Sequence, residues 1–304
     1  MTASGLSSLT AFRNRVRTTT LAVPGVFNAF SARLVERAGF EAAYISGAGI
    51  SAARALPDIG LLTMTEMAME TKQIAQAVDI PVFVDADTGY GEIHQVYRAV
   101  REFALVGAAG IQLEDQATTK RCGHLPGKVL IEKAAMCRKI AAAVEAKRDR
   151  DFLVIARTDA RANEGLAGAI DRAKAYRAAG ADAVFPEALE SAEEFAQFAA
   201  ALRDPTLILI ANMTEWGKTP YLSVKDFAQL GYHLVLFPMT LFRMAARVME
   251  EALQELVSQG TQRNLLERMQ ARQTLYEILR YQAYDEFEKR LHERQVSHEH
   301  ERRE

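Results

Sequence analysis

Short runs of apolar and mostly β-branched residues recur along the chain, and each run is bounded by Gly, Pro or Asp. Such runs are typical of β-strands, and apolar residues on both faces are typical of parallel strands covered by helices. The predicted strands are Leu21–Val23, Ala42–Ile45, Val82–Val84, Gly110–Leu113, Leu153–Ala156, Ala183–Phe185, Leu207–Ile210 and Leu234–Phe237.

The segments between these runs carry apolar residues at the 3.6-residue spacing of amphipathic helices. The predicted helices are Ala29–Ala38, Met64–Val78, Val96–Val106, Lys133–Ala146, Leu166–Ala179, Ala192–Leu202 and Val224–Leu230. Regular alternation of strand and helix indicates βα units, and eight such units predict a (β/α)8 barrel of the TIM type. A doubly wound open sheet is the alternative, but no Gly-x-Gly-x-x-Gly motif follows the first strand.

The chain continues well beyond the eighth predicted strand. Thr240–Gln259 is followed by a highly charged helical stretch from about Leu265 to Arg294. We therefore expect one (β/α)8 domain over residues 1–304, with a C-terminal helical extension at about 261–294 that packs on a neighbouring subunit. The polar tail at 297–304 is expected to be frayed.

Composition narrows the class of function. A chain of 304 residues fits a barrel with a tail, and a formal net charge of −2 provides no basic field to gather nucleic acid or anionic membrane. No apolar run reaches the roughly 18 to 20 residues of a membrane span. Two cysteines cannot form a disulfide framework and favour the cytoplasm, although the arginine-rich and acid-free first 35 residues also resemble an organelle transit peptide. A small molecule is therefore the expected partner.

Polar residues follow the predicted strands at their C-terminal ends. In a barrel these ends meet at one mouth, where the active site lies. The residues concerned are Ser46 and Gly47 after the second strand, Asp85 and Asp87 after the third, Glu114 and Asp115 after the fourth, Arg157 and Asp159 after the fifth, Glu187 after the sixth, and Asn212 after the seventh.

Asp85 and Asp87 leave an apolar strand for a glycine-bearing loop, Asp-Ala-Asp-Thr-Gly. Carboxylate oxygens of this kind suit Mg²⁺, which uses one or two carboxylates and completes its shell with water and substrate; Mn²⁺ has similar ligand preferences. A solvated loop with helix-capping aspartates is the alternative. Further acidic residues, Glu114, Glu187 and Asp58, arrive from other strands and loops and favour the metal site.

Cys122 lies in the sequence Lys120-Arg121-Cys122-Gly123-His124. A thiol among these potential cations has a stabilised thiolate and suits proton transfer or nucleophilic attack. The alternatives are a basic surface loop or half of a zinc site, but no further Cys or His stands at zinc-finger spacing. Cys137 lies within a helical pattern and is expected to be a small packed residue.

Arginines are candidates for binding substrate carboxylates, because the guanidinium group offers a bidentate fork. Arg157, Arg243 and Arg272 are the candidates, although spacing relative to the strands supports Arg157 alone.

These motifs resemble those of the isocitrate lyase superfamily, and of methylisocitrate lyases in particular. The resemblance covers nearly the whole chain and rests on the Lys120–His124 loop and on the Asp85–Gly89 segment. Further matching segments are Tyr44–Gly47, Leu56–Asp58, Ile155–Ala160, Phe185–Ala188, Ala211–Glu215 and Phe242-Arg243.

The resemblance implies a (β/α)8 barrel that exchanges its last helix with a neighbour in a homotetramer. It also implies that Asp85 and Asp87 hold Mg²⁺, with Asp58 and Glu114 in its outer shell. The implied substrate-binding residues are Ser46, Gly47, Ala48, Cys122, Gly123, Arg157, Phe185, Glu187, Asn212, Met213, Thr214, Leu236, Arg243 and Arg272. Ala48 stands where many relatives carry glycine.

The activity that the resemblance implies is the cleavage of a tricarboxylate, 2-methylisocitrate, into pyruvate and succinate. Such a reaction passes through a succinate enediolate, which needs cations for stabilisation and an acid that protonates its carbon. The expected roles are Cys122 as the acid, Arg121 and His124 as charge-stabilising groups, and Tyr44 as the base, with Glu187 also in the catalytic set.

Sibling activities remain open. The short chain favours a methylisocitrate lyase over the longer isocitrate lyases, and Phe185 and Leu236 stand where isocitrate enzymes have Trp and Thr. The alternatives are 2,3-dimethylmalate lyase and, less favoured, oxaloacetate hydrolase or carboxyphosphonoenolpyruvate mutase chemistry. A catalytically silent barrel that serves as a binding module is the alternative outside enzymes.

Overall fold

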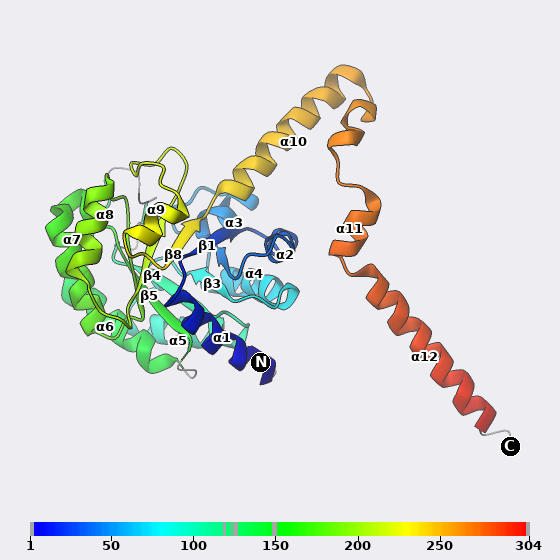
Figure 1. The fold of residues 1–304 in the computed structure, drawn as a ribbon, viewed down its shortest axis with the longest axis horizontal. Helices are drawn as coiled ribbons and strands as arrows, with labels where there is room; N and C mark the ends of the chain where they lie inside the picture. The colour runs from blue at the N-terminus through cyan, green and yellow to red at the C-terminus, as the bar shows by residue number, and fades with distance from the viewer. Residues whose placement is uncertain (1–2, 118–119, 122, 124–126, 148–150, 302–304) are drawn as a thin grey trace. The chain divides into compact units, whose positions relative to one another are not determined.

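The computed structural model describes residues 3–117, 120–121, 123, 127–147 and 151–301, and its centre is a closed barrel. The strands pair in parallel in sequence order from β1 to β8, and β8 pairs with β1 (Figure 1). The strands are β1 (Leu21–Val26), β2 (Ala43–Ile45), β3 (Val82–Asp85), β4 (Gly110–Glu114), β5 (Leu153–Thr158), β6 (Ala183–Pro186), β7 (Ile208–Asn212) and β8 (Leu234–Phe237). The predicted barrel is confirmed.

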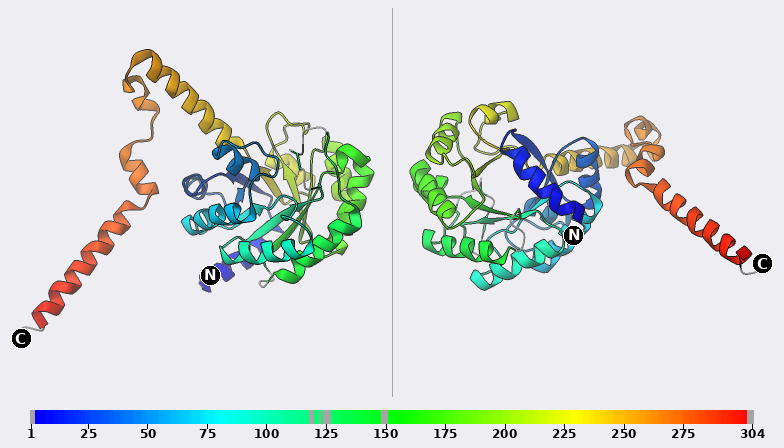
Figure 2. Two further views of the ribbon diagram at one scale, coloured as in Figure 1. Left: turned by 180° about the vertical axis from the view of Figure 1, so that it is seen from behind. Right: turned by 60° about the horizontal axis from the view of Figure 1, so that its bottom comes forward.

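Helices surround the strands in both views of Figure 2. In the first compact unit they are α1 (Ala3–Val16), α2 (Ala29–Arg37), α3 (Gly47–Ala53), α4 (Met64–Ala77), α5 (Ile93–Leu105), α6 (Lys133–Ala146), α7 (Arg161–Ala178), α8 (Ala192–Ala201) and α9 (Val224–Gln229), followed by the start of α10 (Thr240–Gln259). The sequence pattern predicted neither α1 nor α3. The predicted helix Leu166–Ala179 missed the first residues of α7. In the structure α7 begins at Arg161 and is interrupted at Gly165, which has a φ of 71°.

Several strands run further toward the mouth than their apolar residues predicted. Asp85, Glu114 and Asn212 are the last residues of β3, β4 and β7, and each is in register with a residue of the next strand. The backbone pairing therefore continues through these polar residues, which fixes their side chains on a rigid part of the barrel.

The apolar core has two parts. One lies between the strands and the surrounding helices, and the other fills the inside of the barrel. Leu9, Phe12 and Val16 of α1 belong to the inner part, and the Phe12 ring lies 5.3 Å from the ring of Phe83 on β3. The arginine-rich N-terminal segment thus contains a structural helix of the barrel, which its mixed polar and apolar residues did not indicate.

Residues 245–304 form a second compact unit. It contains the rest of α10, a 3-10 helix η1 (Arg263–Arg268), α11 (Arg272–Ile278) and α12 (Tyr281–Glu301), so the predicted C-terminal helices are present. The helix α12 extends into the segment 297–304, for which fraying was expected. Within the described part of the chain, no helix combines the length and apolar character that a membrane crossing requires.

Truncating Phe12 tests how far α1 stabilises the barrel. Phe12 is buried inside the barrel, so we expect Phe12→Ala to lower the free energy of unfolding by about 3 to 5 kcal/mol. Leu105→Ala is the control, because that side chain is 69% exposed on α5. Urea titrations of both variants measure the difference, and equal small effects would show that α1 contributes little.

His233 predicts a pH dependence of stability. Its Nδ1 accepts a hydrogen bond of 3.0 Å from the N–H of Leu209, and burial lowers the pKa of the imidazole. The unfolded chain therefore binds the proton more readily than the folded protein. The stability that neutral His233 contributes is complete above the unfolded pKa of about 6.5 and is lost as the pH falls below it. His233→Asn keeps an acceptor without titrating. We expect its unfolding free energy to fall less steeply between about pH 7.5 and 5 than that of the wild type, and parallel curves would contradict this assignment.

Candidate active site

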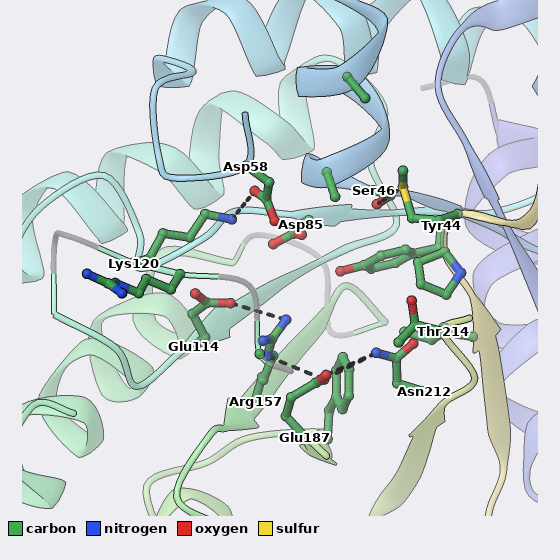
Figure 3. Close-up of a pocket in the computed structure, with 18 of the residues that line it drawn as sticks. Tyr44, Ser46, Asp58, Asp85, Glu114, Lys120, Arg157, Glu187, Asn212 and Thr214 are labelled. Atoms are coloured by element: carbon green, nitrogen blue, oxygen red, sulfur yellow. Dashed lines mark hydrogen bonds and ion pairs between the residues drawn. The ribbon is translucent and has the colours of Figure 1, made fainter. Parts of the chain in front are cut away.

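A cavity of about 320 Å³ opens at the C-terminal mouth of the barrel. Its walls come from the ends of β2 to β8 and from the loops that follow them, and Figure 3 shows the polar side chains pointing into it. The lining residues include Tyr44, Ser46, Ala48, Asp58, Asp85, Glu114, Lys120, Arg121, Gly123, Arg157, Phe185, Glu187, Asn212, Thr214, Leu236 and Arg243. The structure thus brings most of the predicted site residues together.

The side chain of Asp85 is anchored at one wall of the cavity. Its Oδ2 accepts a hydrogen bond of 3.2 Å from the N–H of Gly47, and its Oδ1 accepts from the N–H of Asp87 at 3.2 Å. Gln112 donates to the same Oδ1 at 3.3 Å. A Cβ on Gly47 would lie 3.0 Å from Asp85 Oδ2, so this close approach needs glycine. The backbone N–H of Gly47 therefore holds the carboxylate of Asp85 in place.

The side chain of Lys120 forms ion pairs with two aspartates, Asp58 and Asp87. Its Nζ lies 2.5 Å from Asp58 Oδ1 and 2.5 Å from Asp87 Oδ1, and only 5% of the lysine side chain is exposed. Burial raises the pKa of the Asp87 carboxyl and the ammonium group of Lys120 opposes this effect, so that the resulting pKa is about 6. The surrounding carboxylates raise the pKa of Lys120 well above its usual value, against the effect of burial. The sequence suggested Lys120 as a cation beside a thiol, whereas its contacts are with carboxylates.

Tyr44 reaches the same wall from β2. Its hydroxyl donates a hydrogen bond of 2.5 Å to Oε1 of Gln112. Burial, followed by the charge of Asp85, raises the pKa of the phenol well above 10, so the Tyr44 side chain is protonated at neutral pH in this structure. Gln112 thus connects Tyr44 with Asp85. It was missed in the sequence, although a polar residue within an apolar strand is a usable signal.

Arg157 lies at the centre of the opposite wall (Figure 3). Its guanidinium donates to both carboxylate oxygens of Asp159 at 2.9 and 3.0 Å. It also lies 3.3 Å from Glu114 Oε2 and 3.7 Å from Glu187 Oε2. These carboxylates raise the pKa of the guanidinium well above its usual value, against the effect of burial, which keeps Arg157 charged.

The side chain of Phe185 packs against this arginine, with its ring centre 5.4 Å from the guanidinium carbon. Asn212 donates to Glu187 from β7, at 3.2 and 3.3 Å to the two carboxylate oxygens. Gly123 lies against the same two charged groups, because a Cβ at this position would come within 2.4 Å of both Arg157 and Glu187. Any larger residue at position 123 would displace this wall.

Arg243 lines the cavity from the start of α10. Its Nε lies 3.3 Å from Glu215 Oε2, and its guanidinium carbon lies 5.0 Å from the ring centre of Trp216. The arginine side chain is 44% exposed, so it can also reach a ligand in the cavity. Thr214 and Leu236 line the cavity beside it, whereas Met213 is buried and does not line it.

Gly47, Asp87 and Met213 do not line the cavity themselves, and three further predicted site residues are not placed relative to it. Arg272 begins α11 in the second compact unit. Cys122 and His124 lie outside the described residues. Their neighbours Lys120, Arg121 and Gly123 line the cavity, so the loop motif approaches it from both sides of Cys122.

Two carboxylates at the mouth have an oxygen that could coordinate Mg²⁺. Asp87 Oδ1 and Glu114 Oε1 are buried without a hydrogen-bond partner, and hard oxygen donors of this kind suit the ion. Among the residues that the structure describes, no three His, Cys, Asp or Glu side chains converge as a ready-made metal cage. This arrangement fits an ion that takes one or two carboxylates and completes its shell with water and substrate.

Comparison with known proteins gives consistent matches. The phosphoenolpyruvate phosphomutase family model matches residues 12–257. A 2-methylisocitrate lyase of Aeropyrum pernix is 50% identical over 86% of this chain and 83% of its own length.

Solved structures agree with this assignment. A 2,3-dimethylmalate lyase, described as a member of the PEP mutase/isocitrate lyase superfamily, is 33% identical with a TM-score of 0.86 over 93% of this chain and 95% of its own. A phosphonopyruvate hydrolase in complex with oxalate and Mg²⁺ is 28% identical, with a TM-score of 0.85 over 93% and 98% of the two chains. The chain belongs to the PEP mutase/isocitrate lyase superfamily and, within it, to the family of the 2-methylisocitrate lyases.

Proposed function

We propose that this protein is a 2-methylisocitrate lyase, which cleaves a carbon–carbon bond to release pyruvate and succinate. The observation that carries the proposal is one cavity that is lined by both carboxylates and arginines. Asp58, Asp85 and Glu114 line it together with Arg121 and Arg243. Such a site can bind a metal ion and an anionic substrate side by side, and the 50% identity to a 2-methylisocitrate lyase supports this substrate.

Mg²⁺ is the proposed cofactor, and Mn²⁺ is expected to substitute for it. Asp85 and Asp87 would hold the ion, with Asp58 and Glu114 in its outer shell, and the phosphonopyruvate hydrolase relative contains Mg²⁺. When bound, the ion would polarise the carboxylate and hydroxyl of the part of the substrate that becomes pyruvate. Lys120, 2.5 Å from Asp87, supplies a second positive charge to the same wall.

The proposed cleavage moves one proton at each end of the broken bond. Tyr44, whose Oη is oriented by Gln112, is the proposed base. It would first lose its own phenolic proton to solvent, and the resulting phenolate would take the proton of the substrate hydroxyl. The bond from the hydroxyl-bearing carbon to its neighbour breaks, and the electron pair remains on the succinate half as an enediolate. Arg121 and His124 would stabilise this negative charge. Cys122 would then deliver its thiol proton to the carbon and complete succinate.

Substrate recognition is assigned to the polar groups of the mouth. The groups that would position the substrate carboxylates come from the start of α3, the end of β7 and the loops around them. They are Ser46, Gly47, Ala48, Asn212, Thr214, Gly123, Arg157, Glu187 and Arg243. Met213 and Arg272 remain proposed substrate contacts. Phe185 and Leu236 would surround the extra methyl group, which is worth about 1 to 3 kcal/mol of discrimination.

A homotetramer with exchanged C-terminal helices is the proposed assembly. Apolar side chains on α12 support it, since Tyr284 is 70% exposed and Phe287 is 55% exposed in the single chain. A cytoplasmic location is proposed because a chain with two cysteines has no disulfide framework to maintain.

Pyruvate release tests the proposed activity. We expect 2-methylisocitrate to be cleaved faster than isocitrate and 2,3-dimethylmalate, and we expect EDTA to abolish the reaction until Mg²⁺ is restored. A coupled lactate dehydrogenase assay measures the rate for methylisocitrate and dimethylmalate, and glyoxylate detection measures it for isocitrate. Preference for 2,3-dimethylmalate would indicate the activity of the relative with a TM-score of 0.86.

Replacing Cys122 tests the proposed acid. Loss of general acid catalysis typically costs about 10² to 10⁴-fold in rate, so we expect kcat of Cys122→Ser to fall within that range while KM changes little. Cys137→Ser is the matched control, because Cys137 on α6 packs against the outer core and is not among the residues that line the cavity. Equal activity of the two serine variants would remove Cys122 from the mechanism.

A further inference from the structure

Two buried polar side chains hold the backbone of the loop motif without lining the cavity themselves. They belong to Gln116 and Lys128, which as whole residues are 1% and 5% exposed. The bottom of the loop is closed by an antiparallel bridge between Gln116 and Leu130 and by a hydrogen bond of 2.8 Å from the N–H of Ala117 to the carbonyl of Val129. Both side chains therefore start from a fixed part of the backbone.

Gln116 makes two contacts with a single residue of the motif. Its Oε1 accepts a hydrogen bond of 2.9 Å from the N–H of Arg121, and its Nε2 donates to the carbonyl of Arg121 at 2.9 Å. A primary amide is the side chain that satisfies a backbone donor and acceptor together. The peptide groups on both sides of Arg121 are thereby fixed.

Lys128 contacts the motif at Gly123. Its ammonium group donates to the carbonyl of Gly123 and, at 3.0 Å, to Oδ1 of Asp159. The same Asp159 binds the guanidinium of Arg157 through both oxygens. Lys128 therefore ties the loop backbone to the charged group that holds Arg157. The carbonyl of Lys128 is itself fixed by Asn163, whose Nδ2 donates to it at 3.0 Å.

We propose that Lys128 and Gln116 are positioning residues for the reaction, which set the backbone of Arg121 and Gly123 against the Arg157 wall. The inference rests on the proposed lyase function and extends it to residues that the substrate does not touch. Gly123 has no room for displacement toward Arg157 or Glu187, since even a Cβ would come within 2.4 Å of each. Loss of either contact leaves the backbone free to move away from them.

The test compares Lys128→Met with Lys147→Met in the full-length protein. Both lysines share an aspartate with an arginine: Lys147 lies 2.8 Å from Asp182, which also pairs with Arg13. Each methionine variant therefore leaves an aspartate paired with arginine. Because a misplacement of about 1 Å can cost on the order of 10²-fold, we expect kcat of Lys128→Met to fall by about that factor with little change in KM. Lys147→Met should retain the kcat of the wild type.

Two further measurements separate positioning from a loss of stability. We expect Lys128→Arg to recover part of the lost kcat, because it keeps a charged donor. We also expect amide hydrogen exchange in a peptide spanning residues 117–129 to become faster in Lys128→Met and to stay unchanged in Lys147→Met. If Lys128→Met does not fold, Gln116→Leu replaces it in the measurements of kcat and of hydrogen exchange. Exchange is then read at the Gly123 amide, because this substitution itself removes the acceptor of the Arg121 N–H.

Wild-type kcat in Lys128→Met, a loss matched by Lys147→Met, or unchanged exchange in the loop peptide would overturn the proposal. Hydrogen exchange also separates a failure of the positioning proposal from a failure of the proposed lyase activity. A wild type that releases no pyruvate from 2-methylisocitrate would refute the proposed function, whereas the exchange comparison would still decide whether Lys128 holds the loop.

Discussion

The concentration of buried carboxylates at the mouth of the barrel is the constraint on which the site depends. Glu114, Asp159 and Glu187 are each at most 1% exposed, and a buried carboxylate without a partner costs several kcal/mol. Arg157 contacts all three, at distances from 2.9 to 3.7 Å. Removing this arginine would leave carboxylates from three successive strands without their shared counterion. The guanidinium therefore stabilises the folded barrel, whatever its role in the reaction.

The same balance of charge explains why a metal ion and a lysine can share one wall. Lys120 forms ion pairs with Asp58 and Asp87. The Asp87 Oδ1 atom nevertheless has no hydrogen-bond partner, because the ion-pair contact with Lys120 is not aligned as a hydrogen bond. Additional positive charge is accommodated where carboxylates outnumber cations. A divalent ion at Asp85 and Asp87 would complete the neutralisation that Lys120 begins, and it would place the substrate's anionic groups next to the loop motif.

Part of this arrangement could be predicted from the sequence, and part could not. The apolar runs predicted the strands, and their order predicted that Asp85, Glu114, Arg157 and Asn212 would share one mouth. Contacts between side chains are set by rotamers and by the closing of loops, which residue spacing does not report. The sequence therefore did not reveal that Arg157 is held by the protein's own carboxylates. It also did not lead to α1, although Leu9, Phe12 and Val16 stand at i, i+3 and i+7, because three apolar residues with Arg13 on the same face give only a weak helical pattern.

Two clusters of the same composition lie at opposite ends of β5 and differ in burial. Near the start of β5, Arg13 and Lys147 share Asp182, with side chains 11 to 15% exposed. After its end, Arg157 and Lys128 share Asp159, and the lysine and aspartate side chains are 1% and 0% exposed. Burying an ion pair more deeply raises its desolvation cost, so the more buried cluster is the poorer source of net stability. What it provides instead is fixed geometry, since Asp159 binds the Arg157 guanidinium through both oxygens and Lys128 joins Asp159 to the Gly123 carbonyl. Lys128 thus binds the Gly123 carbonyl of the loop motif, so the cluster at the mouth holds this part of the loop in a fixed position at the site.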